Sequence, residues 1–371
     1  AIPTYNRLEK LKVLLNSIDK QIFSKNLDLS LFISNIASTD GTSEFLEEEV
    51  QKRYNLKVYN RPEDQTIKPN IFYLNKIISS DIEWVWFMGD DDKLSEKESL
   101  QKIYKCLKEN KTENLEFVCI CQTKRSNNTS KVFLDKVFNL CNRFGYHEML
   151  GWISGIILKR QTFKKVFDDC AQSVKTQYNE LGDNLTSAYP HSASILKYTH
   201  NKEGLFYDIG LVEAQDELQT KETQIRWVEE NMLWRYFHVI DDIENLINLE
   251  ILKPKSLSLS FFRYQTVFLW DHLIFLTFKR LPQYVHNCTD LDEINNHISI
   301  LSNNLCRLLK TENFLKDVKD RKDLVLKITM CINYLQIYVS NNFSEEIKIN
   351  LFDSLTNVIQ IPNFPFQIYS D

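Results

Sequence analysis

The chain has 371 residues, of which 43% are hydrophobic, and it contains only 8 glycines and 8 prolines. A chain of this length and composition can bury a large core and is expected to fold as two domains. Its net charge of -5 and the lack of any Lys/Arg block interleaved with aromatic residues argue against a nucleic-acid partner.

Short apolar runs alternate with amphipathic helical patterns at the start of the chain. Strands are predicted over Ala1–Pro3, Leu29–Ser34, Leu56–Tyr59 and Trp84–Met88, and helices over Arg7–Lys20, Ser43–Tyr54 and Ile71–Ser79. Strands that alternate with helices of about 10 to 15 residues imply a parallel sheet with helices on both faces. We therefore expect the chain segments 4–7, 35–42, 60–70 and 89–92, which follow these strands, to gather at one sheet edge.

Three consecutive carboxylates, Asp90, Asp91 and Asp92, follow the apolar strand Trp84–Met88. Adjacent carboxylates repel one another unless a cation or hydrogen-bond donors offset their charge. Open α/β sheets bind ligands at the carboxyl ends of their strands, where these aspartates are expected. The alternative is an acidic turn that caps a helix predicted over Ser95–Leu107.

Further strands are predicted over Leu115–Thr123 and Trp152–Leu158, with Lys131–Phe133 pairing with the first of them, and a helix over Gln161–Gln172. After about residue 205 long helical patterns rich in aromatic residues take over: Ile225–Ile247, Ser258–Arg280, Leu291–Leu309, Asp323–Ser340 and Ser344–Ile359. The prediction is an α/β domain over residues 1–205 and an all-helical domain over 206–371.

Four motifs in this order resemble the second family of inverting glycosyltransferases, which use the GT-A fold, a Rossmann-like domain with a mostly parallel sheet. They are Pro3–Arg7 (PTYNR), Ala37–Thr42 (ASTDGT), Asp90–Asp92 (DDD) and Gly182–Asp183. Shorter segments, Ile33–Asn35, Trp86–Gly89 and Gly151–Gly155, look most like the branch that contains the abequosyltransferases of O-antigen assembly.

The resemblance implies that the acidic run holds a divalent cation, Mn²⁺ or Mg²⁺, and the ribose of a nucleotide-sugar. A cation there would act as a Lewis acid on the departing diphosphate. Asp92 is the expected direct ligand, and Asp90 is expected to assist through water or the ribose. Asp91 could serve either purpose.

The same resemblance places Pro3, Thr4, Tyr5 and Arg7 in the wall of the nucleotide pocket. The backbone of the first strand end would reach the base, and Tyr5 would offer a stacking face. For Tyr5 and Arg7 the alternative is simple packing at the start of a helix.

Asn35 stands where the family often carries an acidic residue, and its amide could bind cytosine as well as uracil. Lys68, and less directly Arg61, could approach the diphosphate, although either could be a solvated surface charge. Asp40 is expected to cap a helix rather than to touch the ligand, because an Asp ahead of a helix satisfies free N–H groups.

Inverting transfer also needs a base that takes the proton of the acceptor hydroxyl. Asp183 follows Leu181–Gly182, in the family's usual place for this residue. The alternative is a helix cap, and Glu180 is the rival base. His191 could reach the diphosphate or the metal, but a structural role is favoured for a lone histidine.

The segment Pro254–Arg280 is rich in Phe, Leu and Trp and carries several basic residues. Such a helix could lie on the cytoplasmic face of the inner membrane, but burial against the catalytic domain or in a homodimer is favoured.

The eight cysteines lack CxxC spacing and are interpreted as reduced, mostly buried thiols of a cytoplasmic protein. No apolar run reaches the roughly 18 residues that a membrane span needs.

The expected function is metal-dependent transfer of a hexosyl or deoxyhexosyl group, with inversion. The donor would be a UDP- or CDP-linked sugar and the acceptor a glycan or lipid-linked molecule, in the synthesis of a bacterial capsule, O-antigen or lipooligosaccharide. One alternative is a nucleotidyltransferase, which would normally carry a Gly-rich basic loop where this chain has PTYNR. Another is a catalytically silent glycan-binding or scaffold protein with the same fold.

Overall fold

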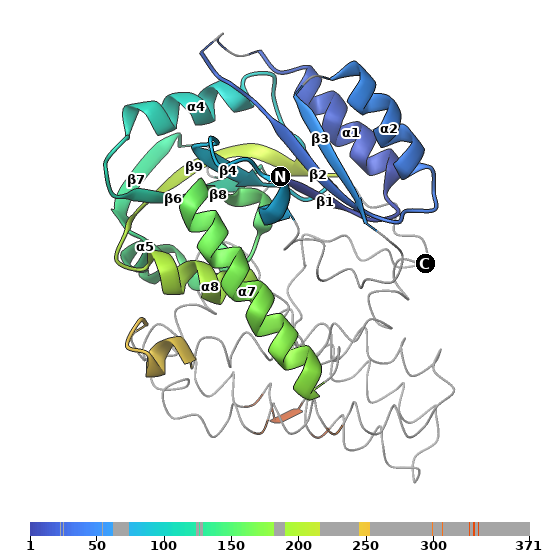
Figure 1. Ribbon diagram of the computed structural model, residues 1–371. Coiled ribbons are helices and arrows are strands. Elements are labelled where there is room, and N and C mark those ends of the chain that lie inside the picture. The colour runs from blue at the N-terminus through green and yellow to red at the C-terminus, as the bar shows by residue number, and fades with distance from the viewer. Residues whose placement is uncertain are drawn as a thin grey trace. The chain divides into compact units, whose positions relative to one another are not determined.

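The computed structural model describes residues 1–22, 24, 26–53, 55–61, 74–123, 126, 129–181, 190–215 and 245–252, with a few isolated positions beyond. The chain divides into two compact units. The first comprises Ala1–Thr176 and His191–Glu217, and the second comprises Gln177–Pro190 and Leu218–Asp371. All described strands belong to the first unit (Figure 1).

The first three strands form a parallel sheet in the order β1-β2-β3, as the alternation of strands and helices predicts. They are β1 (Ile2–Thr4), β2 (Leu31–Ile36) and β3 (Leu56–Arg61). The register places Thr4 beside Asn35 and Asn35 beside Asn60. The three strands therefore end together at one edge of the sheet.

Strand β4 (Trp84–Phe87) lies on the other side of β1. The Ala1 nitrogen donates to the Trp86 carbonyl (2.8 Å), and the Ala1 carbonyl accepts from the Met88 N–H (3.0 Å). This alternation is the hydrogen-bond pattern of a parallel pair. The segment after β4, which carries the aspartates, therefore comes beside the segment after β1.

A second, mixed sheet has the order β4-β8-β6-β9-β5, with β7 also paired to β9. Its members are β5 (Asp92–Leu94), β6 (Leu115–Gln122), β7 (Lys131–Lys136), β8 (Ile156–Lys159) and β9 (Glu203–Ala214). Only β6 and β9 run parallel in it; the other pairs are antiparallel. The sheet predicted to be parallel is thus parallel over β1, β2 and β3, whereas β4 belongs to the mixed sheet, in which it pairs antiparallel with β8.

Helices cover both faces of these sheets, as predicted. They are α1 (Leu8–Asp19), α2 (Thr42–Lys52), α4 (Ser99–Glu109), α5 (Val137–Phe144), α6 (Tyr146–Leu150), α7 (Arg160–Leu181) and α8 (Pro190–Thr199), with a short 3₁₀ turn at Ile153–Gly155. Figure 1 shows α1 and α2 side by side near β1 to β3.

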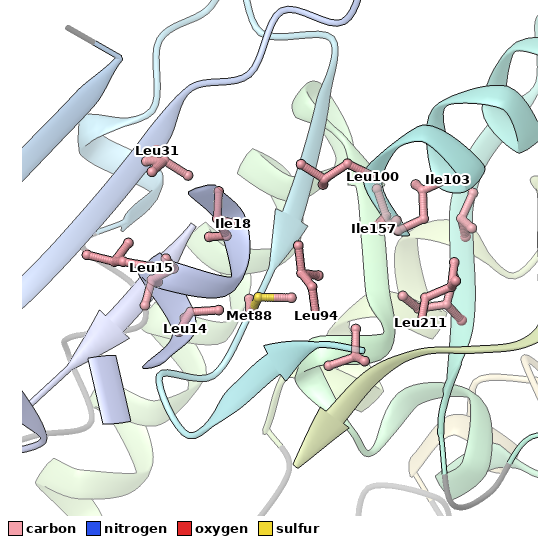
Figure 2. Close-up of a cluster of buried hydrophobic side chains, with 14 of the residues drawn as sticks. Leu14, Leu15, Ile18, Leu31, Met88, Leu94, Leu100, Ile103, Ile157 and Leu211 are labelled. Carbon is pink, nitrogen blue, oxygen red and sulfur yellow. The ribbon is translucent and has the colours of Figure 1, made fainter. Parts of the chain in front are cut away.

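One continuous core joins α1 and α4 to the strands. Figure 2 shows Leu14, Leu15 and Ile18 of α1 facing Leu31 and Met88. The same cluster continues through Leu94, Leu100, Ile103, Ile157 and Leu211. On the opposite face, the ring of Phe87 in β4 meets Phe167 of α7 edge to face, with centroids 5.2 Å apart. The tip of β4 is therefore anchored from both sides.

Three predictions about the elements differ from the structure. The segment Asp92–Leu94, just ahead of the predicted helix Ser95–Leu107, is the strand β5, and α4 begins only at Ser99, so the aspartates do not cap that helix. Strand β7 pairs with β9 rather than with β6. Strand β9 crosses the expected domain boundary at residue 205, because its parallel pairing with β6 keeps it in the first unit as far as Glu217.

The helical patterns predicted beyond residue 205 lie almost wholly outside the described residues, of which 245–248 are helical. Among the described residues no helix is both long and apolar enough to cross a membrane. Five of the cysteines, at 106, 119, 121, 141 and 170, are buried, as expected.

Candidate active site

The segments that follow β1 and β4 meet at the aspartates. Asp90 is only 5% exposed, and its Oδ2 accepts a hydrogen bond from the Thr4 hydroxyl (2.8 Å). Arg7 Nη1 lies 3.1 Å from Asp90 Oδ1. Burial raises the pKa of the Asp90 carboxyl to about 6, although the positive charge of Arg7 acts in the opposite direction.

The Arg7 guanidinium bridges two of the three aspartates. Its Nη1 atom lies 2.7 Å from Asp91 Oδ2 as well as 3.1 Å from Asp90 Oδ1. Asp91 is the most exposed member of the run, with 38% of its side chain accessible. Arg7 therefore supplies part of the positive charge that adjacent carboxylates need.

Asp92 is as buried as Asp90 but faces different partners. Its Oδ2 accepts a hydrogen bond from the Ser154 hydroxyl. Burial, and after it the charge of Asp91, raise the pKa of the Asp92 carboxyl to about 7, against hydrogen bonds from Ser154 and Trp152. A cation beside this carboxyl would favour its charged form.

Gly89 allows this turn to close tightly. Its N–H donates to Ser154 Oγ (2.8 Å), and a Cβ at this position would stand 2.7 Å from Asp91 Oδ1 and 3.3 Å from Asp92 Oδ2. Ser154 is itself held by Trp86, whose indole N–H donates to the Ser154 carbonyl (2.9 Å). The turn from Gly89 to Asp92, called the acidic turn from here on, is thus packed against Ser154.

Asn35 lies at the end of β2 and is fully buried. Its Nδ2 donates to Ser43 Oγ (2.9 Å) and to Asn60 Oδ1 (3.0 Å), and its Oδ1 accepts from the Ser38 hydroxyl (2.5 Å). An amide nitrogen has two hydrogens, and both are used here. Donation from the Asn35 amide to a nucleobase would require it to give up one of these two acceptors.

The turns after β1 and β2 are braced against each other. Asn6 donates its N–H to Ser38 Oγ (2.9 Å), and Asn6 Oδ1 accepts the N–H of Thr39 (2.8 Å). Both turns contain a non-glycine residue with positive φ, at Asn6 (48°) and Ala37 (30°). Such a conformation costs energy and persists only where the surroundings hold it.

The Asp40 carboxylate accepts hydrogen bonds from backbone N–H groups at helix N-termini, as the sequence predicts. Its Oδ2 accepts the N–H of Leu8 at the start of α1 (2.9 Å), and its Oδ1 accepts the N–H of Thr42 at the start of α2 (3.1 Å). Burial alone would raise the pKa of this carboxyl, but the bonds from Thr42 and Leu8 lower it below its ordinary value. One carboxylate therefore caps two helices.

Of the other expected nucleotide contacts, Pro3 lies in β1 and Tyr5 directly after it, both partly buried. Arg61 is the last residue of β3. Lys68 and Asp183 lie outside the described residues, and the rival base Glu180 belongs to the end of α7.

The surroundings of His191 are those of a residue with a structural role. It is buried at the start of α8, and its Nε2 lies 3.0 Å from the Leu150 carbonyl. Burial lowers the pKa of the His191 imidazole to about 4, so the ring is neutral at physiological pH. These contacts agree with the structural role that the sequence favours for a lone histidine.

Two residues in contact with the aspartates were not among the predicted site residues. Ser154 lies in the segment Gly151–Gly155, which carries part of the family resemblance, and that pattern could have indicated it. Gln215 follows β9 and donates to the backbone of the acidic turn. No local pattern marks Gln215, because its contact depends on the pairing of β5 with β9.

The donor set suits a hard divalent cation. Carboxylate oxygens are the ligands that Mg²⁺ and Mn²⁺ prefer, and Mg²⁺ is usually held by one or two carboxylates together with substrate phosphates. Among the described residues no three His, Cys, Asp or Glu side chains are grouped so that they could hold an ion alone. Asp92 and Asp90 would therefore suit such an ion if further oxygens, such as those of a phosphate group, completed its ligands.

Residues 1–170 match the model of glycosyl transferase family 2. This region contains the acidic turn and the residues Thr4, Arg7 and Ser154, which hydrogen-bond to its side chains. The resemblance expected from the four motifs is confirmed at the level of the family.

A curated relative supports the finer resemblance. Over 99 residues this chain is 39% identical to the abequosyltransferase RfbV of Salmonella typhimurium (strain LT2). The match spans 27% of this chain and 29% of that protein. The chain thus covers less than a third of the length of this curated relative.

Among solved structures, TarS of S. aureus is 16% identical with a TM-score of 0.50, over 96% of this chain and 54% of that one. A second TarS structure, of residues 1–349, is 17% identical with a TM-score of 0.49, over 100% of this chain and 93% of that one. At this level of identity the likeness concerns the fold, which for residues 1–170 is GT-A-like.

Proposed function

We propose that this chain is an inverting glycosyltransferase. It would transfer a hexosyl or deoxyhexosyl group from a UDP- or CDP-linked donor to a glycan or lipid-linked acceptor, in the synthesis of a bacterial surface polysaccharide. The family of residues 1–170 and the similarity to an abequosyltransferase support this proposal.

The observation that carries the proposal is the acidic turn between β4 and β5. Three carboxylates stand at a strand end, two of them nearly fully buried, and Thr4, Arg7 and Ser154 hold them in place. Burying carboxylates raises their free energy unless a positive charge or donors compensate. The free-energy cost of burying these carboxylates supports a site at which the ligand binds together with a cation.

In the proposed reaction, Asp183 takes the proton of the acceptor hydroxyl while the hydroxyl oxygen attacks the anomeric carbon from the face opposite the leaving group. The bond between the anomeric carbon and the diphosphate oxygen breaks, and its electron pair leaves with the nucleoside diphosphate. Mn²⁺ or Mg²⁺, when bound at Asp92 and Asp90, supplies the positive charge that stabilises this leaving group.

The nucleotide is proposed to lie beside the ends of β1 and β2, with Pro3, Thr4, Tyr5 and Arg7 along it. Thr4 and Arg7 already contact Asp90, so the nucleotide wall and the acidic turn share residues. Asn35 and Lys68 remain proposed contacts to the base and the diphosphate.

Residues 218–371, which belong to the second unit, are proposed to form a helical domain that binds the acceptor, contacts the inner membrane peripherally on its cytoplasmic face, or forms a homodimer. The basic aromatic segment Pro254–Arg280 is the sequence feature that supports these three uses.

Thermal unfolding with UDP-, CDP-, GDP- and dTDP-sugars, each with and without Mn²⁺, would identify the donor. A ligand that binds only the native state raises the melting temperature by mass action. The proposal expects one nucleotide class to stabilise the protein only when Mn²⁺ is present. A panel without any shift would contradict it and favour a scaffold protein.

Substitution then tests the assigned residues. Asp92→Ala and Asp183→Ala should each abolish sugar transfer in a protein that remains folded by circular dichroism. Asp81→Ala, at an exposed aspartate ahead of β4, serves as the matched control and should retain activity. Full transfer by either of the first two variants would refute the corresponding assignment.

A further inference from the structure

A single residue contacts the backbone of all three aspartates. Gln215 donates its own N–H to the Asp91 carbonyl (2.9 Å). Its side-chain Nε2 lies 3.0 Å from the Asp92 carbonyl and 3.4 Å from the Asp90 carbonyl. Residues more than 120 positions apart in sequence are thereby joined at the turn.

The same side chain also holds the helix that follows Arg7. Gln215 Nε2 lies 2.9 Å from the carbonyl of Lys10 in the first turns of α1. Arg7 stands immediately before α1 and bridges Asp90 and Asp91. Gln215 therefore connects the backbone of the turn to the helix that carries its cationic partner.

Strand pairing in the mixed sheet places Gln215 beside the acidic turn. Strand β5 pairs antiparallel with β9, and Asp92 lies opposite Ala214, the residue just before Gln215. The amide consequently meets the carbonyls of the turn rather than the carboxylates. A neutral amide can satisfy several carbonyls without changing the charge of the site.

We propose that Gln215 is a positioning residue that sets the geometry of the acidic turn and, through it, the affinity for the divalent cation. This inference rests on the proposed function. Carbonyl groups held by fixed donors keep the three Cα atoms of Asp90, Asp91 and Asp92 in one arrangement. Residues that orient metal ligands typically affect metal affinity by about 10- to 100-fold.

The test substitutes Gln215→Met, which removes the amide but keeps the length, the charge and the backbone N–H. Mn²⁺ affinity is measured by electron paramagnetic resonance of free Mn²⁺, using the full chain. The expected result is a Kd raised by about 10-fold or more, together with transfer activity that recovers as Mn²⁺ is increased. Such recovery distinguishes a positioning role from a merely structural one.

Gln21→Met is the matched control. Gln21 Nε2 also donates to two backbone carbonyls, of Ser17 (3.1 Å) and Glu96 (2.7 Å), away from the aspartates. Its substitution should lower the melting temperature and leave the Mn²⁺ Kd unchanged.

Each outcome bears on a different claim. A wild-type chain that binds no Mn²⁺ even with saturating UDP or CDP overturns the metal dependence of the proposed function and the inference with it. A wild-type chain that binds Mn²⁺ with the same Kd as folded Gln215→Met overturns the inference alone. If Gln215→Met does not fold, Gln215→Asn, which keeps an amide with a shorter reach, is judged by the same Kd criterion.

Discussion

The Ser154 hydroxyl donates to the Asp92 carboxylate and accepts the N–H of Gly89, so it closes the acidic turn from the 3₁₀ turn that precedes β8. Asp92 and Ser154 are 62 positions apart in sequence. They meet because β8 pairs antiparallel with β4, with Ile156 opposite Phe87. Asp92 is buried, and the hydrogen bond from Ser154 stabilises its charged form.

Ser154→Ala should therefore weaken Mn²⁺ binding by about 10- to 100-fold, because an orienting hydrogen bond to the proposed ligand is lost. Isothermal titration with Mn²⁺ measures the change. Ser194→Ala removes a comparable bond to a carboxylate, from Ser194 Oγ to Asp169 Oδ2 (2.8 Å), and should leave the Mn²⁺ Kd at the wild-type value. Equal affinity in the Ser154 variant and in this control would contradict the assigned role.

Gly89→Ala should reduce Mn²⁺ affinity through steric displacement of the aspartates. The added Cβ would stand 2.7 Å from Asp91 Oδ1, closer than real contacts allow, so that carboxylate must move. In an Asp91→Ala background the obstructing oxygen is gone, and the further loss on Gly89→Ala should be smaller. A double-mutant cycle measures this coupling between the two substitutions. If the losses in Mn²⁺ affinity simply add, the contact with Asp91 is not the cause of the effect of Gly89→Ala.

Arg7→Gln should destabilise the cation-free protein and make its stability more dependent on Mn²⁺. Arg7 offsets the charges of Asp90 and Asp91, and a bound divalent cation would replace that offset. Differential scanning fluorimetry should show a larger Mn²⁺-induced rise in melting temperature for the variant than for the wild type.

Arg53→Gln is the control for this experiment, because Arg53 bridges the carboxylates of Asp19 and Glu49 away from the site. It should lower the melting temperature with no change in the Mn²⁺ response. A wild-type Mn²⁺ response in Arg7→Gln would argue that Arg7 does not share the aspartates with a cation.

His191 should make the stability of the fold depend on pH. Its pKa falls from the usual 6.5 to about 4 on burial, so the unfolded chain binds this proton more readily than the folded chain. Stability is therefore present above pH 6.5 and is lost as the pH falls toward 4, by up to ~3 kcal/mol for this group. Urea unfolding at several pH values should show a shallower acid-side loss for His191→Gln than for the wild type.

His200→Gln is the matched substitution, since His200 directly follows the same helix, is partly exposed and hydrogen-bonds to the nearby Lys197 carbonyl and Asn201 side chain. Its unfolding free energy should keep the wild-type dependence on pH. An unchanged acid-side slope in His191→Gln would mean that other groups control it.

Local sequence patterns were sufficient for the first part of the fold. Apolar periodicity places β1, α1, β2, α2, β3 and β4 within a few residues of their observed bounds, because each pattern reflects which residues of one element are buried. Strand β9 was not predicted, because Gly204, Gly210 and the buried Asp208 interrupt its apolar run. A Cβ at Gly204 would meet Val137, and one at Gly210 would meet Thr123, so tertiary packing requires both glycines.

The sequence by itself determined that three carboxylates follow a buried strand and that residues 1–170 carry the motifs of one glycosyltransferase family. Only the tertiary structure decided that Ser154 and Gln215 hold those carboxylates and their backbone, and that the amide of Asn35 is already engaged. The physical reason is that a motif is a property of neighbouring residues. The contacts of Ser154 and Gln215 exist only once β4 has paired with β8, and β5 with β9.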